Sequence, residues 1–399
     1  MRRNRIAAID VGTSKVCTIM ADVDDSGVPR ILGVGITPSH GLQKGAVVNI
    51  NEAKVAIRES VRKAEQIAGF RIESAIIGIT GRNISSTNNR GVVAITRNDQ
   101  LVRSDDLRRV MDVAKAVKVP GDQKLLHVIP RDYNIDGQEG VKNPVGMHGF
   151  RLDVETHIIS MAQASVQNLV KCIRGIGVDI EELVFGPLAS AAAVLTQEER
   201  ENGVLLADIG GGTTDIALYR NNSVYHTSIL PVAGYQITHD IAVGLGLSFE
   251  MAEEVKRRYG NVLPNTNGDG DRALNAGGHS VNYGDMLRIL RIRTEEMLRL
   301  VILELPQGDY ASIIPAGIVL TGGSANIPGL SELAAEVTHM PVRIGTPSNL
   351  YGIWDALCDP AYATAVGLLV WKLNFSEAPH GITQKATRTF TSRMSRLFS

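Results

Sequence analysis

Two distant stretches of the chain follow the same order of apolar strand, glycine turn and second strand. The apolar residues 6–9 lead into residues 10–15, after which a β-prone apolar pattern resumes. Far downstream, the apolar residues 204–207 lead into residues 208–215 and again into an apolar stretch. Each pattern predicts a strand, a tight turn and a strand. A repeat of this kind indicates two related lobes that face one another.

Helical spacing of apolar residues appears between and after these repeats. It predicts helices over residues 104–119, 248–259 and 283–305, the first with Ser104 as N-cap and Pro120 as a stop. Two further helices, over residues 186–193 and 362–369, consist mostly of small residues. Short side chains let backbones approach closely, so we expect these two helices to pack tightly.

Length and composition narrow the class of protein. A chain of 399 residues exceeds what one hydrophobic core usually supports, which agrees with two lobes. The formal net charge of -1 gives no reason to expect a nucleic-acid partner.

Cys17, Cys172 and Cys358 lie far apart, so free thiols in a reducing compartment are expected rather than a zinc site or disulfides. The N-terminus has no signal-peptide pattern and no apolar stretch is long enough to span a bilayer, which favours a cytosolic protein with peripheral membrane contact at most.

The repeated turns carry the residue types that hold a phosphate chain. Glycine lets several backbone amides turn toward one anion, hydroxyls add donors, and lysine neutralises phosphate charge. The candidate phosphate-binding residues are Gly12, Thr13, Ser14, Lys15, Gly210, Gly211, Gly212, Thr213 and Thr214. Asp10 and Asp208 would hold Mg²⁺ largely through its waters, and Asp208 and Asp215 are the candidate catalytic residues, Asp215 by positioning a water.

A single turn of this kind is often only a hairpin, so the pair carries the interpretation. No P-loop and no Rossmann glycine motif occurs in the sequence. A third glycine turn, with Gly322, Gly323 and Ser324, follows the apolar residues 316–320. It is either an ordinary strand-to-helix turn or a surface on which a nucleoside packs.

Taken together, five segments resemble the nucleotide-binding motifs of the actin/Hsp70/sugar-kinase superfamily. Residues 10–15, 185–187, 208–215, 320–324 and 363–367 match phosphate-1, connect-1, phosphate-2, adenosine and connect-2, in that order. The resemblance implies an α/β, two-lobed actin-like (ribonuclease H-like) fold that binds ATP and Mg²⁺. Connect-1 here reads Val-Phe-Gly-Pro and lacks a polar residue to position water, so slow hydrolysis at most is expected.

More narrowly, residues 41–45, 228–234 and 238–242 and the end of the chain resemble the FtsA family of bacterial division proteins. That resemblance implies a set of subdomains: 1A over 1–81, 163–199 and 360–374, 1C over 82–162, 2A over 200–234 and 310–359, and 2B over 235–309. It also implies a linker over 375–384 and a membrane-targeting amphipathic helix over 385–399.

The same resemblance implies further site residues. Glu253 and Lys256 would touch the adenosine, although a pair with this spacing is usually a solvated ion pair. Subdomain 2B would bind the C-terminal tail of FtsZ, with Arg293 as the first candidate and Arg291, Arg288 and Arg299 beside it. Solvated surface charge is an equally good interpretation of most of these arginines.

The last fifteen residues have the pattern of a basic amphipathic helix. Phe390, Met394, Leu397 and Phe398 fall on one stripe, while Arg393 and Arg396 lie off it. Such a segment binds anionic lipid surfaces. A helix docked on the protein itself is the alternative.

These features lead to one functional hypothesis. The chain is expected to bind ATP, to self-associate at the cytoplasmic face of the inner membrane at the division site, to tether FtsZ filaments there, and to recruit later division proteins. A small-molecule kinase of the same superfamily and an actin-like protein of pilus assembly are the alternatives. An Hsp70-type chaperone is less well supported, because little chain follows Trp371.

Overall fold

The computed structural model describes residues 4–23, 28–117, 120–263, 272–306, 308, 310–348, 350–352 and 355–375. The expected amphipathic helix over 385–399, and the expected linker beyond Phe375, lie outside these residues. The chain forms two compact units. Among the described residues, one unit comprises residues 4–87, 120–129 and 157–370, and the other comprises residues 88–117, 130–156 and 371–375.

The first repeat builds a mixed sheet. Strands β1 (Asn4–Val11), β2 (Lys15–Val23) and β3 (Pro29–Pro38) form an antiparallel meander. Strands β6 (Ser74–Ile79) and β11 (Asp179–Phe185) extend it in parallel on the β1 side, and the short β19 (Tyr351–Gly352) pairs with β3. The order is β11-β6-β1-β2-β3-β19.

The second repeat builds the same sheet again. Strands β12 (Val204–Ile209), β13 (Thr214–Arg220) and β14 (Ser223–Leu230) form an antiparallel meander. Strands β17 (Ile318–Thr321) and β18 (Val342–Ile344) continue in parallel beside β12, in the order β14-β13-β12-β17-β18. Three antiparallel strands followed by two parallel ones occur in both sheets, which confirms the predicted duplication and the two-lobed actin-like fold.

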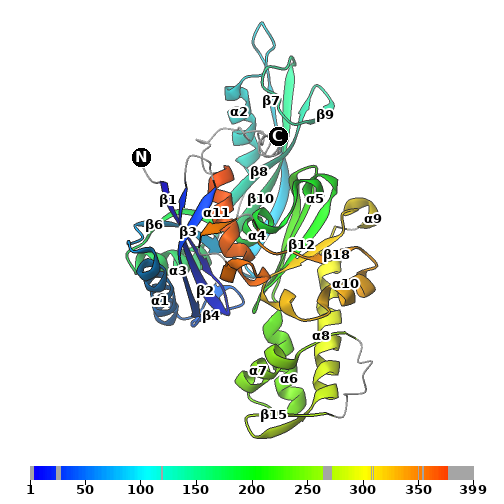
Figure 1. Cartoon of the computed structure of the whole chain (residues 1–399). Coiled ribbons are helices and arrows are strands. Elements are labelled where there is room, and N and C mark those ends of the chain that lie inside the picture. The colour runs from blue at the N-terminus through cyan, green and yellow to red at the C-terminus, as the bar shows by residue number, and fades with distance from the viewer. Residues whose placement is uncertain are drawn as a thin grey trace, which may run out of the picture. The chain divides into compact units, whose positions relative to one another are not determined.

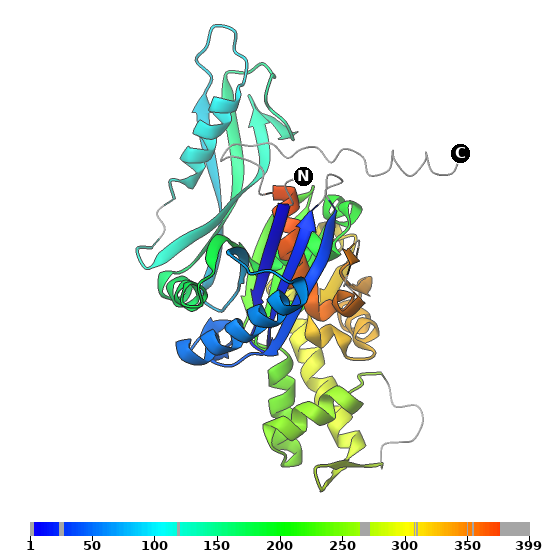
Figure 2. The same ribbon diagram turned by 60° about the vertical axis from the view of Figure 1, so that its left-hand side comes forward.

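Helices cover both sheets. Helix α1 (Ile50–Ala68) crosses β2 and β3 in the first lobe and packs against α3 (Gln163–Arg174) (Figure 2). Helices α4 (Gly186–Val194) and α11 (Ala363–Phe375) are the predicted small-residue helices. They touch backbone to backbone, because a Cβ added at Gly367 would lie 1.8 Å from the carbonyl oxygen of Ala189.

Helices of the second lobe gather around a separate hydrophobic cluster (Figure 1). They are α6 (Gly234–Leu245), α7 (Phe249–Tyr259) and α8 (Tyr283–Leu303), with the hairpin of β15 (Ala273–Ala276) and β16 (His279–Asn282). Helix α10 (Leu330–Thr338) packs on α8, and the shorter helices are α5 (Gln197–Asn202), α9 (Tyr310–Ile313), η2 (Gly323–Asn326), η3 (Asp355–Leu357) and η4 (Pro360–Tyr362). None of the helices in the described part of the chain is both long enough and apolar enough to cross a membrane.

The second compact unit contains parts of a four-stranded sheet. Its strands are β7 (Ile84–Ala94), β8 (Gln123–Ile135), β9 (Gln138–Val141) and β10 (Arg151–Ala162), in the order β7-β10-β8-β9. Helix α2 (Ser104–Lys115) accompanies it. The helix starts at Ser104, but the predicted N-cap is wrong by one residue: Arg103 occupies that position, and its N–H donates to the Asp106 carboxylate at 2.9 Å. The helix also ends at Lys115, short of the predicted residue 119.

Candidate functional site

The two glycine turns close in the same way. The N–H of Gly12 donates to the carbonyl of Lys15 at 3.0 Å, and the N–H of Gly210 donates to the carbonyl of Thr213 at 2.9 Å. In each lobe the aspartate before the turn is the second-last residue of its strand, Asp10 in β1 and Asp208 in β12. The repeated sequence therefore produces a repeated backbone arrangement.

The two turns meet. A Cβ added at Gly212 would lie 2.7 Å from Thr13 Oγ1, and a Cβ added at Gly211 would lie 3.1 Å from Ser14 Cβ. No larger residue fits at Gly212 without a shift of the opposite turn. The structure thus brings the predicted phosphate-binding residues of both lobes into one place.

Three aspartates lie at this junction, and each has a raised pKa. Burial raises the pKa of Asp10 to about 6, with Lys15 acting to lower it and Asp208 to raise it further. Burial also raises the pKa of Asp215 to about 7, and the neighbouring Asp208 adds to the shift. The pKa of Asp208 is likewise raised by burial, opposed chiefly by the hydrogen bond from Thr364. Like charges gathered out of water in this way favour a bound cation.

Hydroxyl groups hold two of these carboxylates. Thr364 Oγ1 donates to Asp208 Oδ2 at 2.8 Å, and Thr80 Oγ1 donates to Asp215 Oδ2 at 2.6 Å. The other oxygen of Asp215, Oδ1, is buried and makes no hydrogen bond to the described residues. The Lys15 ammonium lies over the ring of Tyr362, 4.9 Å from its centre, which places a positive charge beside the phosphate-1 turn.

The carboxylates suit Mg²⁺ that carries its own water and phosphate ligands. Within the described ranges, no three His, Cys, Asp or Glu side chains form a group that could hold a metal ion. Mg²⁺ usually keeps several waters and binds proteins through one or two carboxylates together with substrate phosphates. Asp10 and Asp208, beside a buried unpaired oxygen of Asp215, fit that mode.

The third glycine turn lies against the second. Gly322 has a φ of 86°, and Ser324 Oγ donates to the carbonyl of Gly210 at 3.0 Å. A Cβ added at Gly322 would lie 2.4 Å from Asp208 Oδ1, so this glycine also adjoins the carboxylate. Gly323 opens the short helix η2 that follows.

Glu253 and Lys256 belong to the same neighbourhood. Lys256 Nζ donates to Glu253 Oε2 at 2.6 Å, to Thr238 Oγ1 at 2.7 Å and to the carbonyl of Gly234 at 3.1 Å. The Lys256 side chain is 9% exposed, and its burial lowers its pKa. A solvated surface pair, the alternative interpretation of these two residues, does not describe them. A Cβ added at Gly234 would lie 2.5 Å from Ser324 Oγ, so the network adjoins the third turn.

The four arginines of α8 divide into two pairs. Arg291 bonds to Glu295, to Glu336 on α10 and to the carbonyl of Val262, while Arg293 bonds to Asp240 and Glu296. Within the described residues, Arg288 and Arg299, whose side chains are 69% and 64% exposed, pair with Asp285 and Glu295 of their own helix. The membrane candidates in residues 390–398 lie outside the described residues.

Sequence reasoning missed the threonines that hold the aspartates. Thr80 follows a plain apolar strand, and an isolated threonine carries no signal of a partner far along the chain. Thr364 was within reach, because it lies inside the segment 363–367 that resembles connect-2. Thr238, which bonds to Glu253 and Lys256 rather than to an aspartate, lies inside the segment 238–242 that resembles the narrower family.

Comparisons with known proteins agree with this arrangement. A family model described as "Cell division protein FtsA" matches residues 205–367, and one described as "SHS2 domain inserted in FTSA" matches residues 81–160. The chain is 42% identical to the cell division protein FtsA of Pseudomonas aeruginosa over 373 residues, covering 92% of this chain and 89% of that protein. It is 38% identical to the Escherichia coli K12 protein of the same name over 379 residues, covering 92% and 90%.

Solved structures resemble the fold at lower identity. The PilM-PilN type IV pilus biogenesis complex aligns with a TM-score of 0.64 at 18% identity, covering 92% of this chain and 98% of that one. MreB5 of Spiroplasma citri bound to ADP aligns with a TM-score of 0.54 at 14% identity, covering 92% and 96%. At these identities the likeness concerns the fold alone.

The raised pKa values predict how stability depends on pH in protein free of nucleotide and Mg²⁺. Between the ordinary value of 3.8 and the raised values of about 6 and about 7, folded Asp10 and Asp215 keep protons that the unfolded chain has released. The free energy of unfolding should therefore fall as pH rises through this interval. Asp215→Asn should reduce the fall in the free energy of unfolding by up to about 4 kcal/mol, measured by urea unfolding across the pH range.

Asp112→Asn is the matched control, because Asp112 is a highly exposed aspartate on α2. It should leave the pH dependence unchanged. Parallel pH profiles for wild-type protein and Asp215→Asn would contradict the prediction.

Proposed function

Because the chain belongs to the FtsA family of cell division proteins, we propose that it binds Mg-ATP between the glycine turns of its two lobes and uses the bound state to organise division proteins at the membrane. The observation that carries the proposal is the meeting of the two turns beside the partly buried Asp10 of one lobe and the buried Asp208 of the other. The identity of about 40% to FtsA proteins over nine-tenths of the chain supports the division role rather than a kinase or a pilus protein.

Each turn has a distinct part in holding the nucleotide. Backbone amides of Gly12, Gly210, Gly211 and Gly212 would face the phosphates, with the hydroxyls of Thr13, Ser14, Thr213 and Thr214 as further donors. Lys15 would neutralise phosphate charge. Bound Mg²⁺ would offset the charge on the phosphates, and Asp10 and Asp208 would hold its waters.

On the nucleoside side, the third turn and the buried ion pair provide the contacts. Gly322, Gly323 and Ser324 would pack against the adenosine, and Glu253 and Lys256 would lie next to it. The MreB5 structures bound to ADP and to AMPPNP belong to proteins of the same fold, which supports nucleotide binding in general.

Hydrolysis, in this proposal, is slow. The Oδ1 oxygen of Asp215 is buried without a hydrogen bond among the described residues, and it would accept the proton from water. A Cβ added at Gly186 would lie 3.1 Å from Asp215 Oδ2. The connect-1 segment at the start of α4 therefore places a glycine next to Asp215 rather than a second polar side chain. Turnover would then rest on a single positioned group.

For the FtsZ tail, the exposed face of α8 offers the best surface. Arg288, Ile292, Arg299 and Leu303 follow the spacing of one helix face, and all four are exposed. A peptide with acidic and apolar residues fits such a face. Arg293, the first candidate from the sequence, would join by exchanging its bond to Asp240, whereas Arg291 is held by three groups of its own lobe.

Membrane attachment would come from residues 385–399. Phe390, Met394, Leu397 and Phe398 gain about 1.5 to 3 kcal/mol each when fully buried, against an ordering cost of about 1 to 2 kcal/mol per residue. Arg393 and Arg396 add about 1 kcal/mol each near anionic lipid. A single tail is therefore a marginal anchor. Several tails held together by self-association would bind far more tightly, because linkage raises the effective concentration.

Mg-ATP binding should appear as thermal stabilisation. At a ligand concentration about one hundred times Kd, folded protein gains about 2.7 kcal/mol, which raises the unfolding midpoint. Asp208→Asn should lose most of this shift, whereas Asp112→Asn should keep it. No shift in wild-type protein with saturating Mg-ATP would refute the proposed nucleotide site.

Charge reversal should weaken binding of a synthetic FtsZ C-terminal peptide, measured by fluorescence anisotropy. The double variant Arg288→Glu and Arg299→Glu should raise Kd about tenfold or more, with the loss shrinking at high salt. Arg62→Glu on α1, at another exposed arginine, is the control. An unchanged Kd in the double variant would exclude this face of α8.

Vesicle binding should depend on protein concentration in a cooperative way. With vesicles of phosphatidylcholine and phosphatidylglycerol and Mg-ATP, the full chain should sediment along a sigmoidal curve, and a chain ending at Pro379 should remain in solution. Vesicles of phosphatidylcholine alone are the control for charge. A simple hyperbolic curve from protein that stays monomeric would contradict the coupling of assembly and attachment.

A further inference from the structure

Thr80 joins the two lobes at the candidate site. It follows directly after β6 of the first lobe, and its hydroxyl donates to Asp215 Oδ2 of the second lobe at 2.6 Å. Strand β6 runs parallel to β1 with Gly78 opposite Asp10, so the strand that carries Asp10 also fixes the position of Thr80. None of the sequence motifs includes this residue.

The two oxygens of Asp215 differ because of this contact. A Cβ added at Gly186 would lie 3.1 Å from Asp215 Oδ2 and 3.6 Å from Thr80 Cβ, so Oδ2 is enclosed by Thr80 and the start of α4. Oδ1 is buried without a hydrogen bond. The hydroxyl of Thr213 also lies near enough to this carboxyl to lower its pKa, although Oδ1 has no hydrogen-bond partner within the described residues. Within the described residues, the hydrogen bond from Thr80 engages Oδ2 and leaves Oδ1 free.

Asp215 and Asp208 are directly opposite one another across the antiparallel pair β13 and β12. Residues opposite in this way present their side chains on the same face of the sheet. A carboxylate oxygen freed on Asp215 thus belongs to the face that carries Asp208, where the phosphate chain is proposed to bind.

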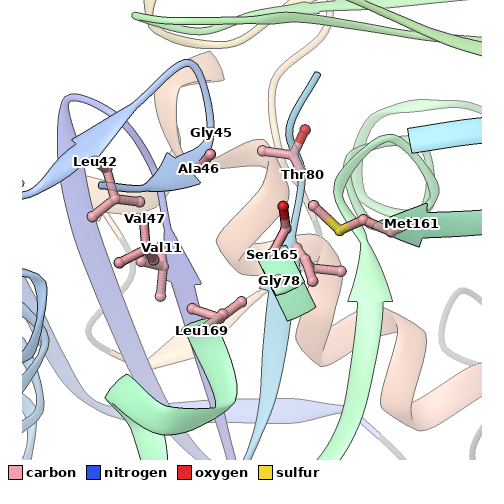
Figure 3. A pocket seen from close by; sticks show the side chains of 11 residues that line it. Val11, Leu42, Gly45, Ala46, Val47, Gly78, Thr80, Met161, Ser165 and Leu169 are labelled. Carbon is pink, nitrogen blue, oxygen red and sulfur yellow. The ribbon is translucent and has the colours of Figure 1, made fainter. Parts of the chain in front are cut away.

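The segment that carries Thr80 packs against the hairpin of β4 (Leu42–Gln43) and β5 (Ala46–Val47). This hairpin turns at Gly45, whose N–H donates to Thr13 Oγ1 at 3.0 Å. A Cβ added at Gly45 would lie 2.9 Å from the Cα of Gly81, so the hairpin is in close backbone contact with the residue after Thr80. Thr80 and Ser165 line a small cavity of about 10 Å³ between this hairpin and α3 (Figure 3). The cavity is on the scale of a single water molecule.

We propose that Thr80 is a positioning residue for ATP hydrolysis, which holds Asp215 Oδ2 so that Oδ1 receives a proton from the attacking water. This inference rests on the proposed nucleotide site, with ATP as the substrate. In the step, the water oxygen forms a bond to the γ-phosphorus while the bond from that phosphorus to the bridging oxygen breaks. The bonding pair leaves with ADP, and one water proton passes to Asp215 Oδ1 and later to solvent.

The test compares Thr80→Val, which keeps the shape and loses the hydroxyl, with Thr80→Ser, which keeps the hydroxyl. Thr80→Val should bind Mg-ATP with a Kd within about threefold of wild type but hydrolyse it about tenfold to a hundredfold more slowly, because a misplaced acceptor costs rate rather than affinity. Thr80→Ser should retain most of the wild-type rate, and Asp215→Asn sets the background rate.

A crystal structure of nucleotide-free Thr80→Val provides a readout that does not depend on activity. The Asp215 side chain should rotate or take several conformers there, while Thr80→Ser should keep the wild-type orientation. An unmoved Asp215 in Thr80→Val, or a hydrolysis rate equal to wild type, would overturn the assignment.

Measuring both binding and hydrolysis distinguishes a failure of the role of Thr80 from a failure of the proposed nucleotide site. If wild-type protein binds Mg-ATP but hydrolyses it no faster than Asp215→Asn, the role of Thr80 is refuted while the nucleotide site stands. If wild-type protein does not bind Mg-ATP, the proposed function itself fails and this inference fails with it.

Discussion

The candidate site depends on three aspartates at the meeting point of two glycine turns, of which Asp208 and Asp215 are buried and Asp10 is partly exposed. Burial raises the pKa of Asp10, Asp208 and Asp215, and the charge of Asp208 acts on both others. A protein gains no stability from such a cluster by itself, since ionised carboxylates are costly to bury. A bound cation would offset the negative charge of these carboxylates and of a phosphate chain beside them. Waters on that cation would donate the hydrogen bonds that the carboxylate oxygens lack.

The duplication explains why the two lobes contribute matching aspartates. One difference between the lobes explains why the third carboxylate comes from the second lobe. Asp10 and Asp208 occupy matching places before their turns, but their cross-strand partners are Cys17 in the first lobe and Asp215 in the second. A third carboxylate therefore comes from one side only. Neutral hydroxyls from the opposite lobe and from α11 hold the acids of the second lobe, through Thr80 and Thr364. This holds the carboxylates in place without adding charge to the site.

How well the sequence predicts a contact in this site depends on how far apart the two contacting residues lie along the chain. The strands and turns around residues 10–15 and 208–215 follow from local apolar pattern and glycine, and the lobes follow from their repetition. The contact between α4 and α11 was foreseeable from small residues, since only glycine at 367 leaves room beside the Ala189 carbonyl. The bond from Thr80 to Asp215 joins residues 135 positions apart and has no local pattern. Burial of the Lys256 pair, and the division of the α8 arginines, likewise depend on tertiary neighbours.

The central claim is that carboxylates from both lobes serve one metal-bound nucleotide. A crystal structure of the chain with Mg²⁺ and a non-hydrolysable ATP analogue tests it most directly. The account predicts one metal ion whose bound waters contact both Asp10 and Asp208, with the phosphates lying between Gly12 and residues 210–212. A nucleotide bound elsewhere, or a metal that meets only one of the two aspartates, would contradict it.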